Sequence, residues 1–375
     1  MKHDKILQDK LDLRAEDNNF RELNATEGLI DFCSNDYLGF ARSTELAEQI
    51  ESLKLENVTN LVGSGGSRLI CGNTSFIERL ESELAEFLDT SSVLLFNSGY
   101  SANTGFFSSV PRRGDVVFYD ELIHASIRDG IKLGLARSFS FKHNDLKNLK
   151  EKVTAINADK SIFVVVESVY SMDGDSPEMV ELADYCFSND IHLVVDEAHS
   201  FGLYGEQGQG LISALGLQEK TYARIITFGK ALGCHGAAIA GSAALRSYLI
   251  NFARPFIYTT ALSIHDQKAI YCSLKRLKGL MIKNLNINNL IDLFGACAEE
   301  KGLHISASDG AIRSVLYRGN ENAKNMEEKL RMNGLSAKAI LSPTVPEGQE
   351  RIRICLHDFN TPDEVRKLVN CLCNG

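Results

Sequence analysis

The chain lacks an apolar run of the length that a membrane-spanning helix requires. About 20 apolar residues are needed to cross a bilayer, and none of the hydrophobic stretches approaches that length. The first residues, Met1-Lys-His-Asp-Lys5, also lack the apolar core of a secretory signal peptide. We therefore expect no membrane partner and a cytoplasmic location.

Positive charge is scarce as well. The 40 Lys and Arg residues are outnumbered by 49 Asp and Glu, which gives a formal net charge of -9 at pH 7. Proteins that bind nucleic acids or anionic membranes mainly through charge carry an excess of basic residues. We therefore expect no nucleic-acid partner.

Cysteine patterns typical of disulfide scaffolds and zinc sites are missing. The nine cysteines form an odd number, include no C-x-x-C pair and have mostly apolar neighbours. Cys371-Leu-Cys373 is a closely spaced pair, but no histidines stand at zinc-site spacing from it. We interpret the nine cysteines as reduced thiols that pack as small hydrophobic residues, and we expect no metal.

What the sequence does contain is a regular alternation of short apolar segments and amphipathic ones. Its 375 residues, of which 44% are hydrophobic, are enough to bury a large core and to form more than one domain. Amphipathic patterns at residues 145–156 and 178–188 predict helices. The apolar segments predict strands at residues 92–96, 115–119, 138–141, 162–166, 192–195, 224–227 and 237–240. Since these strands show no alternation of polar and apolar residues, both faces of their sheet should be buried.

These elements predict an α/β fold with more than one domain. Residues 37–265 should form a large doubly wound domain with a mostly parallel sheet, in which ligands bind beyond the carboxyl ends of the strands. Residues 1–36 are charged, and we expect a helix there that packs as an N-terminal arm. Residues 266–375 should form a smaller α+β domain, with strands at 311–317 and 351–356 and a closing helix from Thr361.

A lysine, an aspartate and a histidine stand at the ends of predicted strands. Lys230 follows one strand, and Asp196 and His199 follow another. This set suits pyridoxal 5'-phosphate (PLP), because the lysine would form a Schiff base with the aldehyde and the imidazole would hydrogen-bond the ring oxygen. A carboxylate at the end of an apolar strand is costly to bury without a cation, and a protonated pyridine nitrogen would be that cation for Asp196.

Further residues would complete such a site, although each also has an ordinary structural explanation. Gly99 and Tyr100 follow a strand and open a helix, where backbone N–H groups bind phosphate, but a plain strand-to-helix turn has the same pattern. Thr227 would add a hydroxyl group, or it simply favours the strand. His124 would lie over the cofactor ring and meet the substrate carboxylate, or it is structural, and Ser171 would reach the ring, or it belongs to a polar turn.

Together these residues resemble the α-oxoamine synthases, a PLP-dependent transferase family of fold type I, the aspartate-aminotransferase fold. The resemblance covers about residues 11 to 370 of the chain. Members of the family condense an amino acid with an acyl thioester and release CO₂. The resemblance is carried by Ser34-Asn-Asp-Tyr-Leu-Gly39, Gly63-Ser-Gly-Gly-Ser-Arg-Leu69, Asn97-Ser-Gly-Tyr100, His124-Ala-Ser126, Ser171-Met-Asp-Gly-Asp175, Asp196-Glu-Ala-His199, Thr227-Phe-Gly-Lys230 and Arg351-Ile-Arg353.

The resemblance implies a role for each of the predicted site residues. Lys230 would carry the Schiff base and remove the α-proton of the substrate, while Asp196 pairs with the ring nitrogen. His199 would meet the ring hydroxyl, and His124 would stack on the ring. Further cofactor contacts would come from Gly99, Tyr100, Thr227 and Ser171. Positions near the substrates are matched by Arg21, Asn35, His124, Thr344 and Arg353, of which Arg353 would clamp the amino-acid carboxylate.

Within the family, the segment Gly63-Ser-Gly-Gly-Ser67 favours L-alanine and a pimeloyl thioester as substrates. The thioester would be carried by coenzyme A or by a carrier protein, and the products would be 8-amino-7-oxononanoate, CO₂ and the free thiol, in biotin biosynthesis. Ile77 departs from the family pattern, because many relatives carry histidine there, and this bears on acyl-chain specificity.

Two other interpretations stay open. One is a reaction of glycine C-acetyltransferase type, or of another α-oxoamine synthase with a different amino acid or acyl thioester. The other is a catalytically silent partner that keeps the fold for assembly, against which the retention of Lys230, Asp196 and His199 argues. The resemblance also implies a homodimer, in which Tyr258-Thr-Thr260 would reach the phosphate site of the neighbouring copy.

Overall fold

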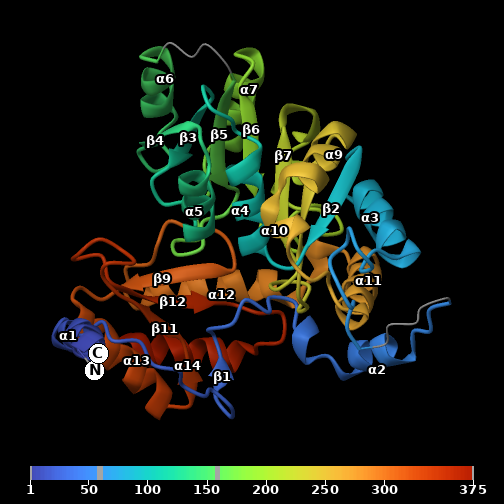
Figure 1. The fold of residues 1–375 in the computed structure, drawn as a ribbon. Coiled ribbons are helices and arrows are strands. Elements are labelled where there is room, and N and C mark those ends of the chain that lie inside the picture. Colours follow the sequence, from blue (N-terminus) through green and yellow to red (C-terminus); the bar gives the residue numbers. More distant parts are fainter. Residues whose placement is uncertain (1, 57–61, 157–160, 374–375) are drawn as a thin grey trace. The chain divides into compact units, whose positions relative to one another are not determined.

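The computed structural model describes residues 2–56, 62–156 and 161–373, and its chain divides into two compact units (Figure 1). The smaller unit comprises Met1–Tyr37, Ser171–Asp175 and Leu285–Gly375. The larger unit comprises Leu38–Tyr170 and Ser176–Asn284. The smaller unit is therefore built from segments that are distant in the sequence, whereas the two segments of the larger unit are separated only by Ser171–Asp175.

The boundaries of these units differ from those that the sequence predicts. Helix α11 (Ile264–Lys278) falls in the larger unit, because it packs against α2 (Thr44–Ser52) and α3 (Ser75–Phe87). The N-terminal residues join the C-terminal ones through a short parallel pair, β1 (Ile30–Asp31) with β10 (Leu335–Ser336). The predicted domains are continuous in sequence. The smaller unit instead combines N-terminal, central and C-terminal segments.

A seven-stranded sheet forms the centre of the larger unit. Its strand order is β2-β8-β7-β6-β5-β3-β4. Strand β8 runs antiparallel to both of its neighbours, and the remaining neighbouring pairs are parallel. The mostly parallel sheet predicted from the sequence is thus confirmed. The strands are β2 (Ser92–Phe96), β3 (Val116–Asp120), β4 (Arg137–Phe141), β5 (Ile162–Glu167), β6 (His192–Asp196), β7 (Ala223–Thr227) and β8 (Ala237–Gly241).

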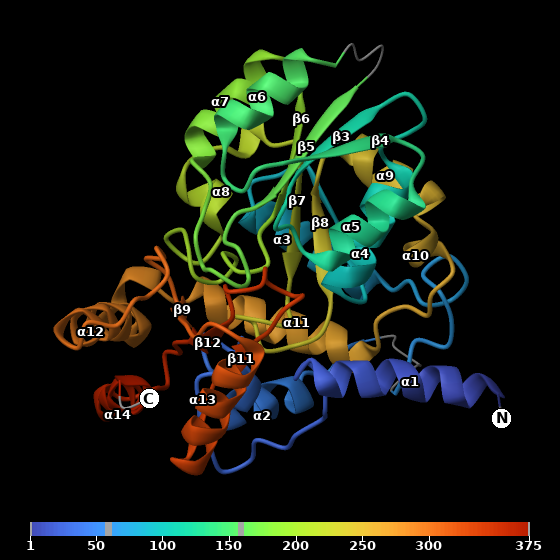
Figure 2. The same ribbon diagram turned by 90° about the vertical axis from the view of Figure 1, so that its left-hand side faces the viewer.

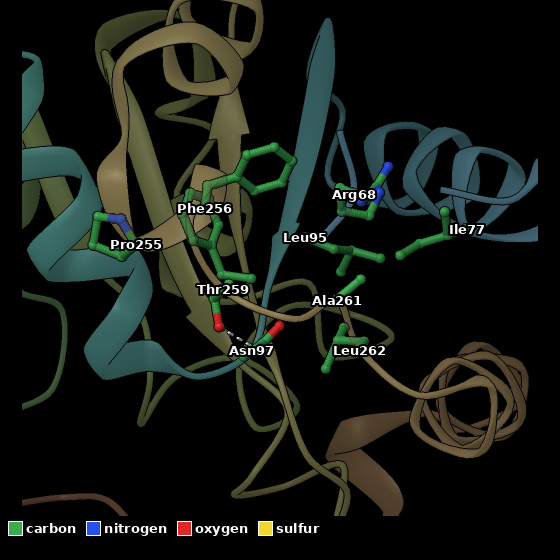
Figure 3. A pocket seen from close by; sticks show the side chains of 10 residues that line it. Arg68, Ile77, Leu95, Asn97, Pro255, Phe256, Thr259, Ala261 and Leu262 are labelled. Atoms are coloured by element: carbon green, nitrogen blue, oxygen red, sulfur yellow. Dashed lines mark hydrogen bonds between the residues drawn. The ribbon is translucent and has the colours of Figure 1, made fainter. Parts of the chain in front are cut away.

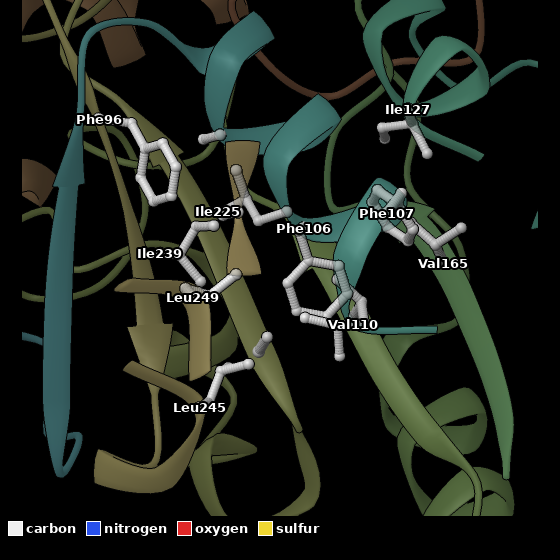
Figure 4. Packing of buried hydrophobic residues seen from close by; sticks show 14 of the residues in the cluster. Phe96, Phe106, Phe107, Val110, Ile127, Val165, Ile225, Ile239, Leu245 and Leu249 are labelled. Atoms are coloured by element: carbon white, nitrogen blue, oxygen red, sulfur yellow. The ribbon is translucent and has the colours of Figure 1, made fainter. Parts of the chain in front are cut away.

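Both faces of this sheet are buried under helices, as predicted. On β5, Phe163 and Val165 pack into one hydrophobic cluster, whereas Val164 and Val166 pack into another. Figure 4 shows the first cluster, where Phe106 and Phe107 of α4 lie on the sheet. Figure 2 shows α6 and α7 on one side of the sheet, with α5 and α9 on the other. The covering helices are α4 (Gly99–Ser109), α5 (Ala125–Leu133), α6 (Leu146–Thr154), α7 (Met179–Ser188), α8 (Leu211–Ala214), α9 (Ala243–Phe252) and α10 (Arg254–Ile257).

The smaller unit has an α+β fold, as predicted. Its antiparallel sheet has the order β11-β12-β9. The predicted helix of the N-terminal arm forms as α1 (Lys2–Glu16), but its side chains from residue 3 onward are exposed, so the expected packing of the arm is not seen in this single chain. The other elements are β9 (Ile312–Leu316), β11 (Lys338–Ile340), β12 (Arg351–Cys355), α12 (Asn286–Glu300), α13 (Asn320–Met332) and α14 (Pro362–Cys373).

The described helices and cysteines agree with the composition. Within the described ranges, no helix is both long enough and apolar enough to span a membrane. All nine cysteines are described, and all are free thiols, as predicted. Cys186 is fully buried in the core, and this burial raises the pKa of its thiol to about 12, so that it packs as a small hydrophobic residue.

Candidate active site

The ends of two neighbouring parallel strands bring the predicted lysine and histidine together. Strand β6 ends at Asp196 and is followed by the turn that carries His199, while Lys230 lies in the turn after β7. Since the two strands are parallel neighbours, these turns meet at one edge of the sheet. Lys230 Nζ lies 2.6 Å from His199 Nε2, and the histidine is only 4% exposed.

Asp196 is a buried carboxylate at the same edge, with only 5% of its surface exposed. One carboxylate oxygen accepts the backbone N–H of Ala198 at 3.0 Å, and the other accepts Nδ2–H of Asn103 at 2.8 Å. No cationic side chain of the described residues forms an ion pair with it. A buried carboxylate that has only neutral donors is stabilised by a cation that enters the site, so Asp196 fits a protonated pyridine nitrogen.

The start of helix α4 presents unused backbone donors. Ser98 caps the helix by accepting the N–H of Ser101 at 3.1 Å. The N–H groups of Gly99 and Tyr100 have no acceptor among the described residues. Thr227 lies close by, because a Cβ added to Gly99 would be 3.6 Å from the threonine hydroxyl oxygen. That hydroxyl donates to the Gly236 carbonyl at 3.2 Å. A helix N-terminus with two unused N–H groups suits a phosphate.

His124 is held at the start of α5 by its backbone and by one ring nitrogen. The backbone N–H of His124 donates to the Glu167 carboxylate at 2.6 Å. The ring nitrogen Nδ1 lies 2.7 Å from the hydroxyl oxygen of Ser126. More than a third of the residue remains exposed. Partial burial lowers the pKa of His124; the charge of Asp196 opposes this effect and the charge of Lys230 reinforces it. The ring is therefore neutral near pH 7 and has an exposed surface for a ligand.

In the smaller unit, the structure brings Arg353, Ser171 and Asn35 together. Arg353 on β12 is 7% exposed, and it donates to the Ser171 carbonyl at 2.6 Å and to the Asn35 side-chain oxygen at 3.0 Å. Burial alone would lower the pKa of Arg353, but the nearby Cys355 and Tyr37 groups outweigh burial and the pKa is raised. Among the described residues, no carboxylate forms an ion pair with this guanidinium. It is thus suited to bind the carboxylate of a substrate.

Three of the predicted contacts stay predictions. Ser171 belongs to the smaller unit, where its carbonyl oxygen binds Arg353, and its predicted contact with the cofactor is not seen in either unit taken alone. Arg21 and Thr344 lie in the same unit and are exposed. In the part of the chain that the structure describes, no side-chain hydrogen bond links either of them to Asn35 or Arg353.

The segment around Ile77 forms part of the core. Ile77 is 1% exposed and lines a small cavity with Leu95 and Phe256 (Figure 3). The cavity holds about 10 Å³, which is room for roughly one water molecule. Arg68 borders it and pairs with Glu81 at 2.8 Å. This cavity is too small for an acyl chain, so the effect of Ile77 on acyl specificity stays a prediction.

The sequence did not predict a second group of residues, which lies behind the site. Arg224 and Glu197 form an ion pair of 2.6 Å, although they are only 3% and 0% exposed. Glu197 also accepts the Ser200 hydroxyl and the Ile212 N–H, both at 3.0 Å. These bonds hold the turn that contains His199. The sequence contained one signal for this pair: an arginine in the apolar strand Arg224-Ile-Ile-Thr227 would be buried and would need an acidic partner.

Comparison with known proteins identifies the family of the chain. The family model for aminotransferase class I and II matches residues 27–372. The chain belongs to this family. An 8-amino-7-oxononanoate synthase of Marinobacter nauticus is 39% identical over 350 residues, which cover 92% of this chain and 87% of that protein.

Solved structures of the family have the same fold. The crystal structure of 8-amino-7-oxononanoate synthase from Francisella tularensis has a TM-score of 0.77 at 30% identity, over 93% of this chain and 98% of that one. Serine palmitoyltransferase from S. paucimobilis, with a bound PLP–myriocin aldimine, has a TM-score of 0.88 at 23% identity, over 100% and 97% of the two chains. The predicted fold type I and the resemblance to α-oxoamine synthases are thereby confirmed.

Proposed function

We propose that this chain is a PLP-dependent acyltransferase that condenses L-alanine with a pimeloyl thioester to give 8-amino-7-oxononanoate, CO₂ and the free thiol, in biotin biosynthesis. One observation carries the proposal. The buried carboxylate of Asp196 has no cationic partner among the described residues, and it lies at the sheet edge where Lys230 and His199 are 2.6 Å apart. The relatives named 8-amino-7-oxononanoate synthase, at 39% and 30% identity, support the choice of substrates.

The residues at this edge fit PLP group by group. The unused N–H groups of Gly99 and Tyr100 would hold the phosphate, with the hydroxyl of Thr227 beside them. Asp196 would pair with the ring nitrogen, and His199 with the ring hydroxyl. When bound, PLP supplies an electron sink for the charge that develops at the α-carbon of the amino acid.

Side chains of this chain would orient the amino acid and move its proton. Arg353 would hold the substrate carboxylate through the donors of its guanidinium group, with Asn35 fixing its orientation at 3.0 Å. Lys230 would remove the α-proton, because its amine hydrogen-bonds to the imidazole of His199 in a mostly buried position. The neutral ring of His124 would cover the reacting groups from its exposed side.

We also propose that the chain forms a homodimer in the cytoplasm. Tyr258 is 73% exposed at the end of α10, with the Arg254 guanidinium 4.8 Å from the centroid of its ring, and exposed aromatic side chains are enriched at protein interfaces. In a dimer, the segment from Tyr258 to Thr260 would contact the phosphate site of the second copy. Sedimentation equilibrium would measure the mass of the assembly, and a monomer at micromolar concentration would contradict this part of the proposal.

Covalent trapping tests the cofactor assignment. The protein is incubated with PLP, reduced with borohydride and digested, and the labelled peptide is identified by mass spectrometry. We expect the label on Lys230, and no label at that site in Lys230→Ala. Lys220→Ala is the matched control, because Lys220 is a surface lysine paired with Asp184 and its loss should leave the label unchanged. A label that is spread over surface lysines would contradict the proposal.

Substrate assays test the reaction. The PLP-loaded protein is given L-alanine with pimeloyl-coenzyme A or with a pimeloyl carrier protein, and 8-amino-7-oxononanoate and CO₂ are measured. Glycine with acetyl-coenzyme A and L-serine with palmitoyl-coenzyme A are the competing pairs. Turnover of a competing pair alone would favour another α-oxoamine synthase. Labelling of Lys230 without turnover of any pair would favour the silent partner.

A further inference from the structure

Helices α4 and α5 lie so close together that only glycine fits at their contact. A Cβ added to Gly130 on α5 would lie 2.9 Å from the Asn103 carbonyl oxygen and 3.0 Å from Thr104 Cα. Ser126 stands one helical turn before Gly130, and it therefore faces the same part of α4. This close approach brings the Ser126 hydroxyl within 3.0 Å of Asn103 Nδ2.

A line of hydrogen bonds runs from the Asp196 carboxylate to the His124 ring through these two residues. Asn103 Nδ2 donates to Asp196 at 2.8 Å and to the Ser126 hydroxyl oxygen at 3.0 Å. The Ser126 oxygen lies 2.7 Å from His124 Nδ1. Asn103 is 2% exposed and Ser126 is 0% exposed, so water does not compete for these bonds. The line connects two residues that the proposed function places on the cofactor.

The polarity of this line follows from the donors that each group has. The amide of Asn103 must point its nitrogen at Asp196, because the reverse orientation would set two acceptor oxygens 2.8 Å apart. Its Oδ1 is buried and has no partner among the described residues. Both N–H groups are then used, so the Ser126 oxygen accepts one of them. The single hydroxyl proton of Ser126 is left to donate to His124 Nδ1.

A second donor reaches the same nitrogen. The backbone N–H of Ser126 points at His124 Nδ1 from 3.2 Å. A ring nitrogen that accepts two hydrogen bonds carries its lone pair and no proton. The proton of the neutral imidazole must then reside on Nε2.

We propose that Asn103 and Ser126 are positioning residues that use the carboxylate of Asp196 to hold His124 as the neutral tautomer protonated at Nε2. The role of His124 toward the cofactor or the substrate rests on the proposed function. The tautomer itself does not, because all of the hydrogen bonds that fix it lie within this chain. The lowered pKa of His124 agrees with a neutral ring. The tautomer gives the site one fixed donor, Nε2–H, for an oxygen atom of the cofactor or the substrate.

Nitrogen-15 NMR of the histidine rings in the full chain without PLP measures the tautomer directly. His124→Gln assigns the His124 signals among those of the nine histidines. In the native chain at neutral pH, we expect a protonated Nε2 and an unprotonated Nδ1. Ser126→Ala removes one of the two donors to Nδ1, and the ratio of the two tautomers should fall roughly fivefold, the equivalent of one net hydrogen bond.

Two further variants complete the test. Asn103→Leu leaves the Ser126 hydroxyl free to rotate, and the tautomer ratio should fall by a smaller factor than in Ser126→Ala. Thr104→Val is the matched control, because Thr104 is 5% exposed on α4 and its hydroxyl donates within the helix to the Tyr100 carbonyl at 2.8 Å. Its loss should leave the His124 signals unchanged. If Ser126→Ala does not fold, Asn103→Leu tests the same line from its other end.

Several outcomes would overturn the inference. These are a proton on His124 Nδ1 in the native chain, a charged imidazole at neutral pH, or native His124 signals in both Ser126→Ala and Asn103→Leu. Because the measurement uses protein without PLP, its failure is distinct from a failure to label Lys230, which would contradict the proposed function alone.

Discussion

A methyl group at Gly130 tests the packing on which the hydrogen-bond line depends. The added Cβ would lie 2.9 Å from the Asn103 carbonyl oxygen, 3.0 Å from Thr104 Cα and 3.0 Å from Phe107 Cβ. Two of these atoms are backbone and the third is fixed to it, so none can rotate away. Overpacking costs about 1–3 kcal/mol, while alanine gains about 1 kcal/mol over glycine in a helix interior. Gly130→Ala should therefore lower the free energy of unfolding by about 1 kcal/mol.

Gly295 in α12 is the matched control, because it is also interior to a helix but has open space around it. Apart from its chain neighbours and the backbone of its own helix, no atom of the described residues lies within 4 Å of a Cβ built there. Gly295→Ala should therefore gain about 0.4–1 kcal/mol of stability. The two substitutions are chemically identical, and the difference in sign comes only from the surroundings.

Urea unfolding followed by far-UV circular dichroism compares the two variants, since the chain has no tryptophan to report by fluorescence. The midpoint should fall in Gly130→Ala and rise in Gly295→Ala. If Gly130→Ala raised the midpoint by as much as Gly295→Ala, the close approach of α4 and α5 would be wrong. The His124 tautomer should also change in Gly130→Ala, because any shift of α5 lengthens the bond from Asn103 to Ser126.

Three other predictions concern single side chains. Glu197→Gln leaves the buried cation of Arg224 unpaired and should cost about 3–5 kcal/mol in urea unfolding. Burial of Asp31 would raise its pKa, but hydrogen bonds from Ser34 and Cys33 outweigh burial and lower the pKa from 3.8 to about 2. The ionised carboxylate of Asp31 therefore stabilises the folded chain above pH 4, and this stabilisation is lost as the pH falls toward 2. Because Asp31 is partly exposed, Asp31→Asn should remove only about 1 kcal/mol of this pH-dependent stability. Arg353→Lys keeps the charge but loses the planar pair of donors, so KM for the amino acid should rise roughly tenfold while PLP still labels Lys230.

Each of these predictions has its own control. Glu328→Gln breaks an exposed ion pair with Arg331 and should leave the unfolding midpoint unchanged, so an equal loss in both glutamate variants would contradict the buried-pair argument. Acid unfolding curves of native chain and Asp31→Asn that run parallel between pH 4 and 2 would refute the role of Asp31. Arg351→Lys is the control for Arg353→Lys, because Arg351 on the same strand already pairs with Asp173. A similar rise in KM for both would show that Arg353 is not the specific clamp.

Much of the larger unit could be predicted because its signals are local. The β-branched runs at residues 162–166 and 192–195 predict buried strands, and both form, as Ile162–Glu167 and His192–Asp196. Lys230, Asp196 and His199 were predicted as a group because each follows such a strand, where α/β proteins bind ligands. The family model for aminotransferase class I and II matches residues 27–372, a range that contains all three of these residues.

Other parts of the fold depended on packing between distant segments. Helix α11 was expected in the C-terminal domain, since nothing in its sequence shows that it packs on α2 and α3. The pairing of β1 with β10 involves strands of two residues each, which are too short to give a periodic signal.

The amino-acid sequence by itself determined where the strands of the larger sheet lie along the chain, the chemical groups at their ends and the family of this protein, because these depend on residue type and short spacing. Only the tertiary structure decided which polar groups meet. Asn103 reads as an ordinary polar residue in the first turns of a helix, and it lies 93 residues from Asp196 in the sequence. The further bond from Asn103 to Ser126 forms because Gly130 lets α5 approach α4 at that point. A hydrogen bond requires its two atoms to lie within about 3 Å, and for distant residues only the packing of the helices sets that distance.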